Sequence, residues 1–313
     1  MITSVFKKST PLNIALVVVL LLIFFFMYQS RDLFTTIFTY GFSKTAILVL
    51  LLLTSFFLVN FTVKKNNLTK NSSYTILFFL LFLLVFPSIF NNLNLLFANF
   101  FLLLAIRRLI SLQTLKAPKE KIFDASIWIF IASLFHFWSI LFILLVYISI
   151  FFHVSRDFRN WLLPFVAFFA TVIIFLFSAL AFDKTWITHI INQTQTNFQL
   201  DYFTNNYQNI ALSFFVVIAL YFLLSLVFSL TNKPLILQAS YKKMIFGLLI
   251  GLTVFLISPD KNNEMLVFTF MPLSVMCTTN IEYSQSKMYQ EIVLLLLISG
   301  CFFSFFSNYN LLP

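Results

Sequence analysis

Long apolar runs separated by short polar segments follow one another along the whole chain. The runs have about 15 to 20 residues, and about 20 apolar residues at 1.5 Å each cross a bilayer as a helix. The pattern predicts an all-α fold, a polytopic transmembrane helical bundle of about eleven helices, forming a single integral membrane domain over residues 1–313. The predicted helices cover residues 11–28, 45–63, 74–90, 94–110, 123–135, 137–153, 162–182, 210–231, 244–258, 265–279 and 291–307.

The distribution of basic residues over the loops tests this assignment of helices, because Lys and Arg collect on the cytoplasmic side of membrane proteins. With the N-terminus inside, the inside loops hold 16 basic residues and the outside loops hold 4. The inside residues are Lys7, Lys8, Lys64, Lys65, Lys70, Arg107, Arg108, Lys116, Lys119, Lys121, Arg156, Arg159, Lys233, Lys242, Lys243 and Lys287. The outside residues are Arg31, Lys44, Lys184 and Lys261. Because the bias persists to the last loop, the sequence predicts an N-in, C-out topology.

Composition supports the same class of protein. Hydrophobic residues make up 61% of the chain and charged residues only 10%, whereas a soluble domain has about 25% charged residues. The net charge of +10 is accounted for by the cytoplasmic loops, so the expected partner is the lipid bilayer and not nucleic acid. Cys277 and Cys301 lie inside apolar segments and are expected to pack there, without a disulfide or a zinc site.

One histidine, His136, lies between two apolar runs. The predicted helix before it has about 13 residues and a length of about 20 Å, too short for a hydrocarbon core of about 30 Å. We therefore expect a recessed helix pair near residues 123–153, with its turn below the outer surface. Irregular backbone at that depth is tolerated only against protein or a watery cavity. The sequence thus predicts a cavity open to the outside, with His136 near its floor as a candidate catalytic residue.

The first outer loop, residues 31–44, has apolar residues at helical spacing, which predicts a helix lying in the membrane interface. Arg31 and Asp32 stand at its start. Asp32 is the second catalytic candidate, as a general base or a metal-assisting carboxylate, and Arg31 is a candidate for substrate binding. Alternatively, the two residues form a solvated pair that caps the helix start, where a carboxylate is favoured.

The longest outer loop, residues 183–209, combines aromatic side chains with Asn, Gln and Thr. Such a mixture suits a sugar or an extended chain, but aromatic residues at a membrane surface also form the ordinary interfacial belt. The candidates for substrate binding on the outer side are Trp186, His189 and Tyr202 from this loop and Asp260 and Glu264 from the turn 259–264. His136 and His189 would share a metal only if the loop folded inward, so neither a metal site nor a cofactor is predicted.

Gly247 and Gly251 are four residues apart in the predicted helix 244–258. Small residues at this spacing let helix backbones approach closely. We expect them to serve packing inside the bundle, with dimerisation as the alternative. No Asp, Glu, Lys or Arg lies centrally in a predicted helix, which disfavours an ion-coupled transporter. The sequence also has no P-loop, HExxH or GxSxG motif.

The chain resembles, over nearly its whole length, an uncharacterised family of polytopic inner-membrane proteins of Bacteroidota. The segments that carry the resemblance are MITSVFKKSTPLNIAL, FANFFLLLAIRRLISLQ, KIFDASIWIFIASLFHFWSILF, SRDFRNWLLPFVAF and ISPDKNNEMLVFTFMPLSVM. The resemblance implies the cytoplasmic (inner) membrane of a Gram-negative cell, but no activity.

The order of the predicted elements is similar to that of C-type membrane glycosyltransferases and polysaccharide polymerases. The similar features are an outer interfacial helix after the first span and short recessed helices with a histidine on the outer side. The similarity implies a polyprenyl-phosphate-linked sugar donor. It matches Asp32 to an acidic residue in the first outer loop and His136 to the histidine of the polymerase-like members. The paired acidic motif of those enzymes is absent from this sequence.

Two functions are compatible with these features. The favoured one is a non-catalytic, degenerate glycosyltransferase-like subunit of a cell-envelope biogenesis or protein-export complex, with other integral membrane proteins as partners. The alternative is a glycosyltransferase or polysaccharide polymerase that uses a polyprenyl-phosphate-linked glycan in an outward-facing cavity.

Overall fold

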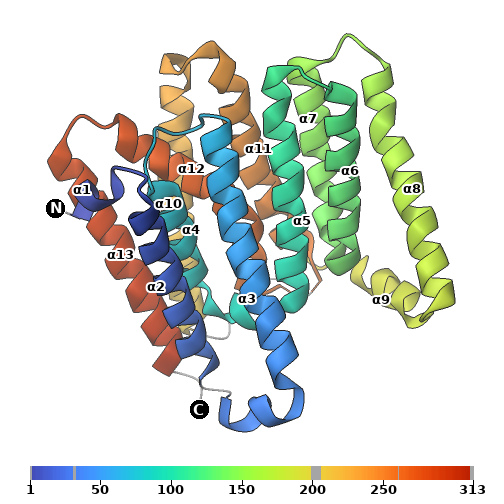
Figure 1. Cartoon of the computed structure of the whole chain (residues 1–313), viewed down its shortest axis with the longest axis horizontal. Helices are drawn as coiled ribbons and strands as arrows, with labels where there is room; N and C mark the ends of the chain where they lie inside the picture. Colours follow the sequence, from blue (N-terminus) through green and yellow to red (C-terminus); the bar gives the residue numbers. More distant parts are fainter. Residues whose placement is uncertain (1, 31–32, 199–205, 260, 311–313) are drawn as a thin grey trace. The chain divides into compact units, whose positions relative to one another are not determined.

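The computed structural model describes residues 2–30, 33–198, 206–259 and 261–310, and the regular elements in these ranges are all helical (Figure 1). Helices lie at all of the predicted positions. They are α2 (Pro11–Gln29), α3 (Leu33–Lys65), α4 (Tyr74–Val85), α5 (Leu93–Ile110), α6 (Pro118–Phe135), α7 (Ile143–His153), α8 (Arg159–Ala181), α10 (Asn206–Ser229), α11 (Leu235–Ile257), α12 (Val267–Tyr283) and α13 (Lys287–Asn310). The shorter elements are α1 (Ile2–Phe6), α9 (Thr185–Gln193), η1 (Pro87–Asn91), η2 (Ser111–Thr114), η3 (Phe137–Phe142), η4 (Leu230–Asn232) and η5 (Asn263–Leu266).

Within the described ranges, 8 helical segments are long and apolar enough to cross a membrane. The chain is therefore a polytopic helical membrane protein. The other predicted spans are α4, α6, and η3 with α7. α4 has 12 residues and α7 has 11, and the first turns of α6 carry four charged residues, Lys119, Glu120, Lys121 and Asp124. The total of eleven crossings and the N-in, C-out orientation stay predictions.

Three helices begin five or more residues earlier than the sequence pattern predicted. α6 begins at Pro118, a residue favoured in the first turn because its missing N–H would have no helical acceptor there. α11 begins at Leu235, directly after Pro234, and not at residue 244. α3 begins at Leu33, so the predicted interfacial segment is helical and continues into the span. Figure 1 shows the first turns of α3 running across the direction of the rest of the helix.

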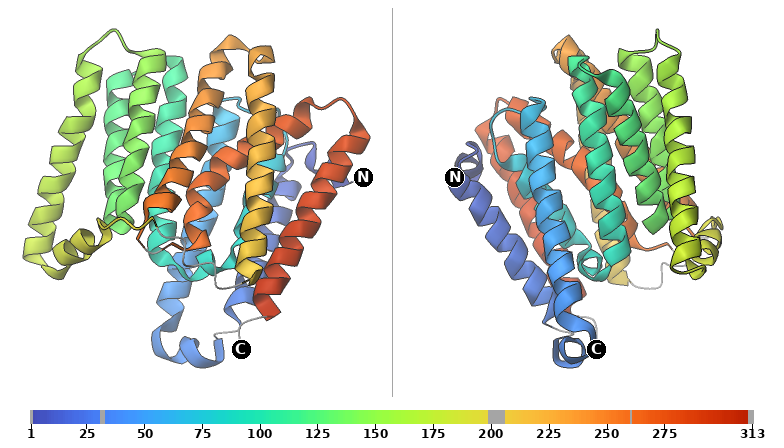
Figure 2. Two further views of the ribbon diagram at one scale, coloured as in Figure 1. Left: turned by 180° about the vertical axis from the view of Figure 1, so that it is seen from behind. Right: turned by 45° about the vertical axis from the view of Figure 1, so that its right-hand side comes forward.

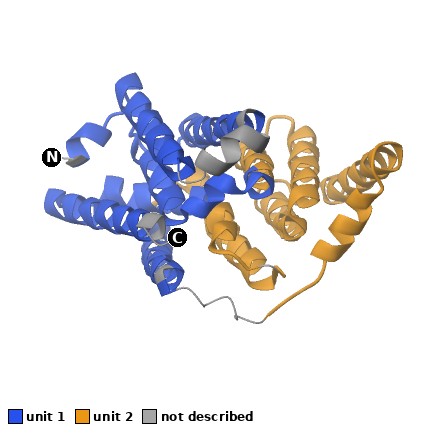
Figure 3. Ribbon diagram, turned by 90° about the horizontal axis from the view of Figure 1, so that it is seen from below, with its two compact units in different colours: residues 1–96, 201–232, 270–313 blue, residues 97–200, 233–269 orange. Residues whose placement is uncertain are grey.

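The chain divides into two compact units (Figure 3). Unit 1 comprises residues 1–96, 201–232 and 270–313, and unit 2 comprises residues 97–200 and 233–269. Each unit brings together segments that are far apart in the sequence. The single integral domain expected from the sequence stays a prediction.

α4 lies at the centre of unit 1, where all of its residues are buried. A helix that is apolar on every side is stable only when it is surrounded. Phe82 of α4 and the following Phe86 pack against Phe215 of α10 and Phe270 of α12, with ring centroids 5.4 to 6.3 Å apart. Such pairs contribute about 0.5–1.5 kcal/mol each beyond burial. The four rings thus join three helices of this unit.

The predicted inside loops of unit 1 contact one another. The backbone N–H of Ser73 donates to Phe6 O at 2.9 Å, which joins the loop before α4 to α1. The backbone N–H of Lys70 donates to Glu282 Oε2 at 2.7 Å, which joins the same loop to the end of α12. Three segments predicted to be cytoplasmic therefore gather at one end of the unit.

In unit 2, α6 packs against α7 and α8, and α7 packs against α11 (Figures 1 and 2). The buried residues of α8 lie mostly three or four positions apart and have small or medium side chains: Asn160, Pro164, Ala167, Thr171 and Ala179. This spacing puts them on one face, and small side chains permit close packing on α6. The larger apolar side chains of α8, such as Phe169, Ile174 and Phe177, are exposed.

Unit 2 has two chemically different ends. α5 and α7 end, and α6, α8 and α11 begin, at the upper end in Figure 1. We call this the basic end and define it as residues 107–124, 153–160 and 240–243. The last turn of α6, which His136 follows, and helix α9 lie at the opposite end, which we call the histidine end (Figure 1). The predicted inside loops of this unit thus gather at one end too, as a consistent topology requires.

Candidate functional site

His136 connects α6 to η3 in an extended backbone conformation, with φ −143° and ψ 104°. The side chain is buried, with 9% of its surface exposed. Its Nε2 lies 3.1 Å from Ser258 Oγ, and Ser258 Oγ itself donates to Val254 O at 2.8 Å. A hydroxyl has one hydrogen to donate, so Ser258 accepts from the imidazole. His136 therefore carries its proton on Nε2.

Ser258 follows the last residue of α11, so this hydrogen bond joins the end of α11 to the turn between α6 and η3. The ring of Phe268 backs the imidazole at 5.6 Å between centroids. The backbone N–H of His136 donates to Ala132 O at 3.1 Å, which ends α6. The surroundings of His136 thus hold three chain segments of unit 2 together.

The last residue of α9 and the segment after it contact this end of unit 2. Gln193 Oε1 accepts from the backbone N–H of Phe137 at 3.2 Å, and Gln195 O accepts from the indole N–H of Trp138 at 3.2 Å. Further along, the backbone N–H of Asn197 donates to Ile257 O at 3.3 Å. One side-chain amide of this loop, that of Gln193, and the backbone of Gln195 and Asn197 thus bind the protein's own turn and helix end.

An apolar groove of about 230 Å³ lies beside the His136 turn. Its lining comes from α6, η3, α8 and α9, and the residues are Phe130, Ser133, Leu134, Phe137, Ile140, Phe168, Thr171, Val172, Phe175 and Ile190. Both hydroxyls in the lining are used within their own helices, because Ser133 donates to Phe130 O at 2.7 Å and Thr171 donates to Ala167 O at 2.8 Å. The groove therefore suits a hydrocarbon chain.

The structure describes three of the other candidates predicted for the outer side. Trp186 and His189 lie on α9 and are exposed, and Glu264 in η5 is half-buried. Arg31, Asp32, Tyr202 and Asp260 lie outside the described residues. Among the described residues, no group of three or more His, Cys, Asp and Glu side chains could hold a metal ion.

The helix-packing glycines lie on α11, and both are buried. A Cβ at Gly251 would lie 2.6 Å from Thr269 Cγ2 and 3.4 Å from the Phe268 carbonyl carbon. The absent side chain of Gly251 therefore allows α11 to lie directly against the start of α12.

A buried lysine that the sequence reasoning assigned to a loop lies at the basic end. Lys243 is 2% exposed, and its Nζ donates to Leu109 O at 2.6 Å and lies 3.1 Å from His153 Nε2. A cation is favourable beside the last carbonyls of a helix, and here it joins the ends of α5 and α7 to α11. Pro234 could have revealed this position from the sequence, because it directly precedes the true start of α11 and so places Lys243 inside the helix.

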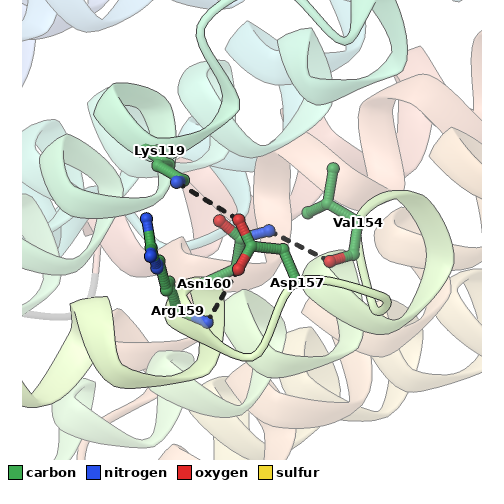
Figure 4. Close-up of polar contacts among 5 residues, drawn as sticks. All are labelled: Lys119, Val154, Asp157, Arg159 and Asn160. Carbon is green, nitrogen blue, oxygen red and sulfur yellow. Dashed lines mark hydrogen bonds and ion pairs between the residues drawn. The ribbon is translucent and has the colours of Figure 1, made fainter.

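Figure 4 shows a second polar cluster at the basic end. Asp157 Oδ2 pairs with Lys119 Nζ at 3.2 Å, and Asp157 Oδ1 accepts from the backbone N–H of Arg159 at 3.0 Å. These bonds, led by the one from Arg159, lower the pKa of Asp157 below its usual range. Asn160 Nδ2 donates to Val154 O at 3.0 Å. The loop before α8 is thereby fixed to the start of α6.

A family of unknown function, DUF6427, has a model that matches residues 1–311, and the chain belongs to this family. No curated protein and no solved structure matches the chain.

Proposed function

We propose that this member of the DUF6427 family is a non-catalytic integral subunit of an envelope-biogenesis or protein-export complex in the inner membrane. The observation that carries the proposal is the environment of His136. A general acid or base has to reach the substrate proton directly or through one water. The Nε2 proton of His136 instead bonds to Ser258, and the ring packs on Phe268. This arrangement supports a structural role for the imidazole.

The edge position of α8 supports a role in assembly. The helix contacts its own unit mainly through its stripe of small side chains, and Phe169, Ile174 and Phe177 are exposed on its other faces. In a bilayer these side chains meet either lipid or another apolar transmembrane helix. We propose that a helix of a partner subunit packs there.

Site-specific photocrosslinking in the native membrane tests this assignment. A photoreactive residue at Phe177 should give an adduct with a second membrane protein. The same residue at Ala167, on the buried stripe, is the matched control and should give only internal products. Lipid adducts alone from Phe177, together with a monomer in native pull-downs, would remove the subunit proposal.

The groove beside the His136 turn favours the second candidate, a glycosyltransferase or polysaccharide polymerase with a lipid-linked donor. Its apolar lining suits a polyprenyl chain. This function requires Asp32→Asn and His136→Ala each to abolish an envelope polysaccharide at unchanged protein level. Normal polysaccharide profiles in both variants would exclude this second function. Loss of the polysaccharide in the Asp32→Asn variant, at unchanged protein level, would count against the non-catalytic role.

A further inference from the structure

The basic end of unit 2 carries far more positive than negative charge. Its three segments contain nine basic and three acidic residues, a net charge of +6. Two of the acidic residues are engaged within the end, Asp124 with Arg108 at 2.8 Å and Asp157 with Lys119 at 3.2 Å. The carboxylates of this end therefore leave most of its positive charge uncompensated.

Two turns at this end combine exposed cations with exposed large apolar side chains. In the turn before α6, Leu115 is 57% exposed beside the exposed Lys116. In the turn before α8, Phe158 is 69% exposed between Asp157 and the exposed Arg159. An apolar tip flanked by cations is the pattern of a surface that enters the boundary between lipid headgroups and acyl chains.

The turn before α6 is held in an uncommon backbone conformation. Leu115 and Ala117 have φ angles of 54° and 46°, in the left-handed region that residues other than glycine seldom adopt. Lys121 Nζ braces the turn by donating to Ser111 O at 2.7 Å and to Thr114 Oγ1 at 2.9 Å. The conformation holds Leu115 and Lys116 exposed, and such strain is concentrated at functional positions.

The two turns form one surface because the pair between Lys119 and Asp157 joins them (Figure 4). We propose that this surface binds the phosphate group of anionic phospholipids. In this arrangement Lys116, Arg156 and Arg159 face the phosphates, and Leu115 and Phe158 enter the acyl boundary. The helices of unit 2 that can span a bilayer begin or end here, so this end meets the headgroup layer. The proposal does not depend on whether the protein is catalytic.

Native mass spectrometry of the detergent-solubilised full chain, titrated with phosphatidylglycerol or phosphatidylcholine, tests the proposal. The parent should bind phosphatidylglycerol about 100-fold more tightly than phosphatidylcholine, because three cations contribute. Each cation near a membrane surface is worth about a fivefold change in binding. The triple variant Lys116→Gln, Arg156→Gln, Arg159→Gln should therefore lose about 100-fold for phosphatidylglycerol, with binding of phosphatidylcholine little changed.

Two further variants separate the contribution of the cations at the basic end from that of the apolar side chain of Phe158. Lys184→Gln, an exposed cation at the histidine end, is the control and should keep the preference. Phe158→Ser should weaken both lipids about tenfold, since burial of one large apolar side chain is lost. Equal affinity of the parent for the two lipids, or a triple variant with unchanged preference, overturns the proposal. Full displacement of phosphatidylglycerol by excess inorganic phosphate also overturns it, in favour of a site for the free ion.

Discussion

A single methyl group added at Gly251 should destabilise unit 2. The new Cβ would lie 2.6 Å from Thr269 Cγ2, whereas carbon atoms in contact lie about 3.5–4.0 Å apart. Thr269 has to retreat by about 1 Å to restore ordinary contact. Its Oγ1 donates to Leu266 O at 2.6 Å, which opposes rotation, and the backbone at Phe268, 3.4 Å from the new atom, blocks a closer approach of the helix.

Two opposing effects set the magnitude of the Gly251→Ala change. Overpacking in a well-packed interior costs about 1–3 kcal/mol, and replacing Gly by Ala inside a helix returns about 1 kcal/mol. The overlap here is large, so we expect a net loss of about 1–2 kcal/mol. For a domain of this size the melting temperature should fall by about 2–8 °C.

A second substitution isolates the contact. Thr269→Ser removes Cγ2 but keeps the Oγ atom that bonds to Leu266 O. On its own it should cost about 1 kcal/mol, the value of one buried methyl group. In the Gly251→Ala background it should be neutral or stabilising, because the clashing atom is gone. The double-mutant cycle should therefore give a coupling of about 1–2 kcal/mol.

Thermal melts in mild detergent measure these effects. Tryptophan emission reports unit 2, because all four tryptophans (residues 128, 138, 161 and 186) belong to it. Labelling of Cys277 and Cys301, both buried in unit 1, is the internal reference. A parent-like or higher melting temperature for Gly251→Ala, or strict additivity in the cycle, would refute the close contact between α11 and the start of α12.

Three further predictions use the same melts. Ser258→Ala should destabilise unit 2 by about 1–3 kcal/mol, because the buried Nε2 of His136 loses its hydrogen-bond partner; an unchanged melt would contradict the hydrogen bond between these two residues. Lys243→Ala should lower the free energy of unfolding by about 2 kcal/mol or more, because packing and hydrogen bonds are lost. Lys242→Ala, at the exposed neighbouring residue, should change it by at most about 0.5 kcal/mol. Equal effects of the two substitutions would argue against burial of Lys243. The pKa of Asp157 is lowered in the folded state, so its stabilisation is present above the unfolded pKa and lost as pH falls through the folded pKa. Asp157→Asn should flatten the acid side of the melting profile below about pH 4, and an identical profile would contradict the two bonds that Asp157 accepts, from the Arg159 backbone and from Lys119.

The sequence was sufficient for the positions of the helices, because the length and apolar character of a span are set by the bilayer and not by partner helices. The loop charges also indicated which ends lie together, and each unit gathers its predicted inside loops at one end. Helix starts were less predictable. The apolar pattern marks where hydrocarbon begins. α6 starts earlier, at Pro118, among charged residues, and α11 starts earlier, directly after Pro234, in a turn of apolar residues that is followed by Gln238, Ser240, Lys242 and Lys243.

The candidate site was harder to predict for a different reason. The recessed position of His136 was predicted from a helix of about 13 residues, whereas α6 has 18, so that position stays a prediction. The partner of His136, Ser258, is 122 positions away in the sequence. Lys243 was assigned to a loop because a charge is expected outside the membrane. In the structure, Leu109 O and His153 Nε2 lie within hydrogen-bonding distance of Lys243 Nζ, so the buried side chain has polar partners inside the unit. Such pairings depend on tertiary contacts, which periodicity does not encode.

The most direct test of the account is the sidedness of the two ends of unit 2. Lys116→Cys at the basic end and Thr188→Cys on α9 each add one exposed thiol to a chain whose own cysteines are buried. A membrane-impermeant maleimide added to intact spheroplasts should label the Thr188→Cys chain and reach the Lys116→Cys chain only after the membrane is permeabilised. Labelling of both thiols from the same side, or of the Lys116→Cys chain alone from outside, would contradict a bundle that crosses the membrane with its basic ends in the cytoplasm.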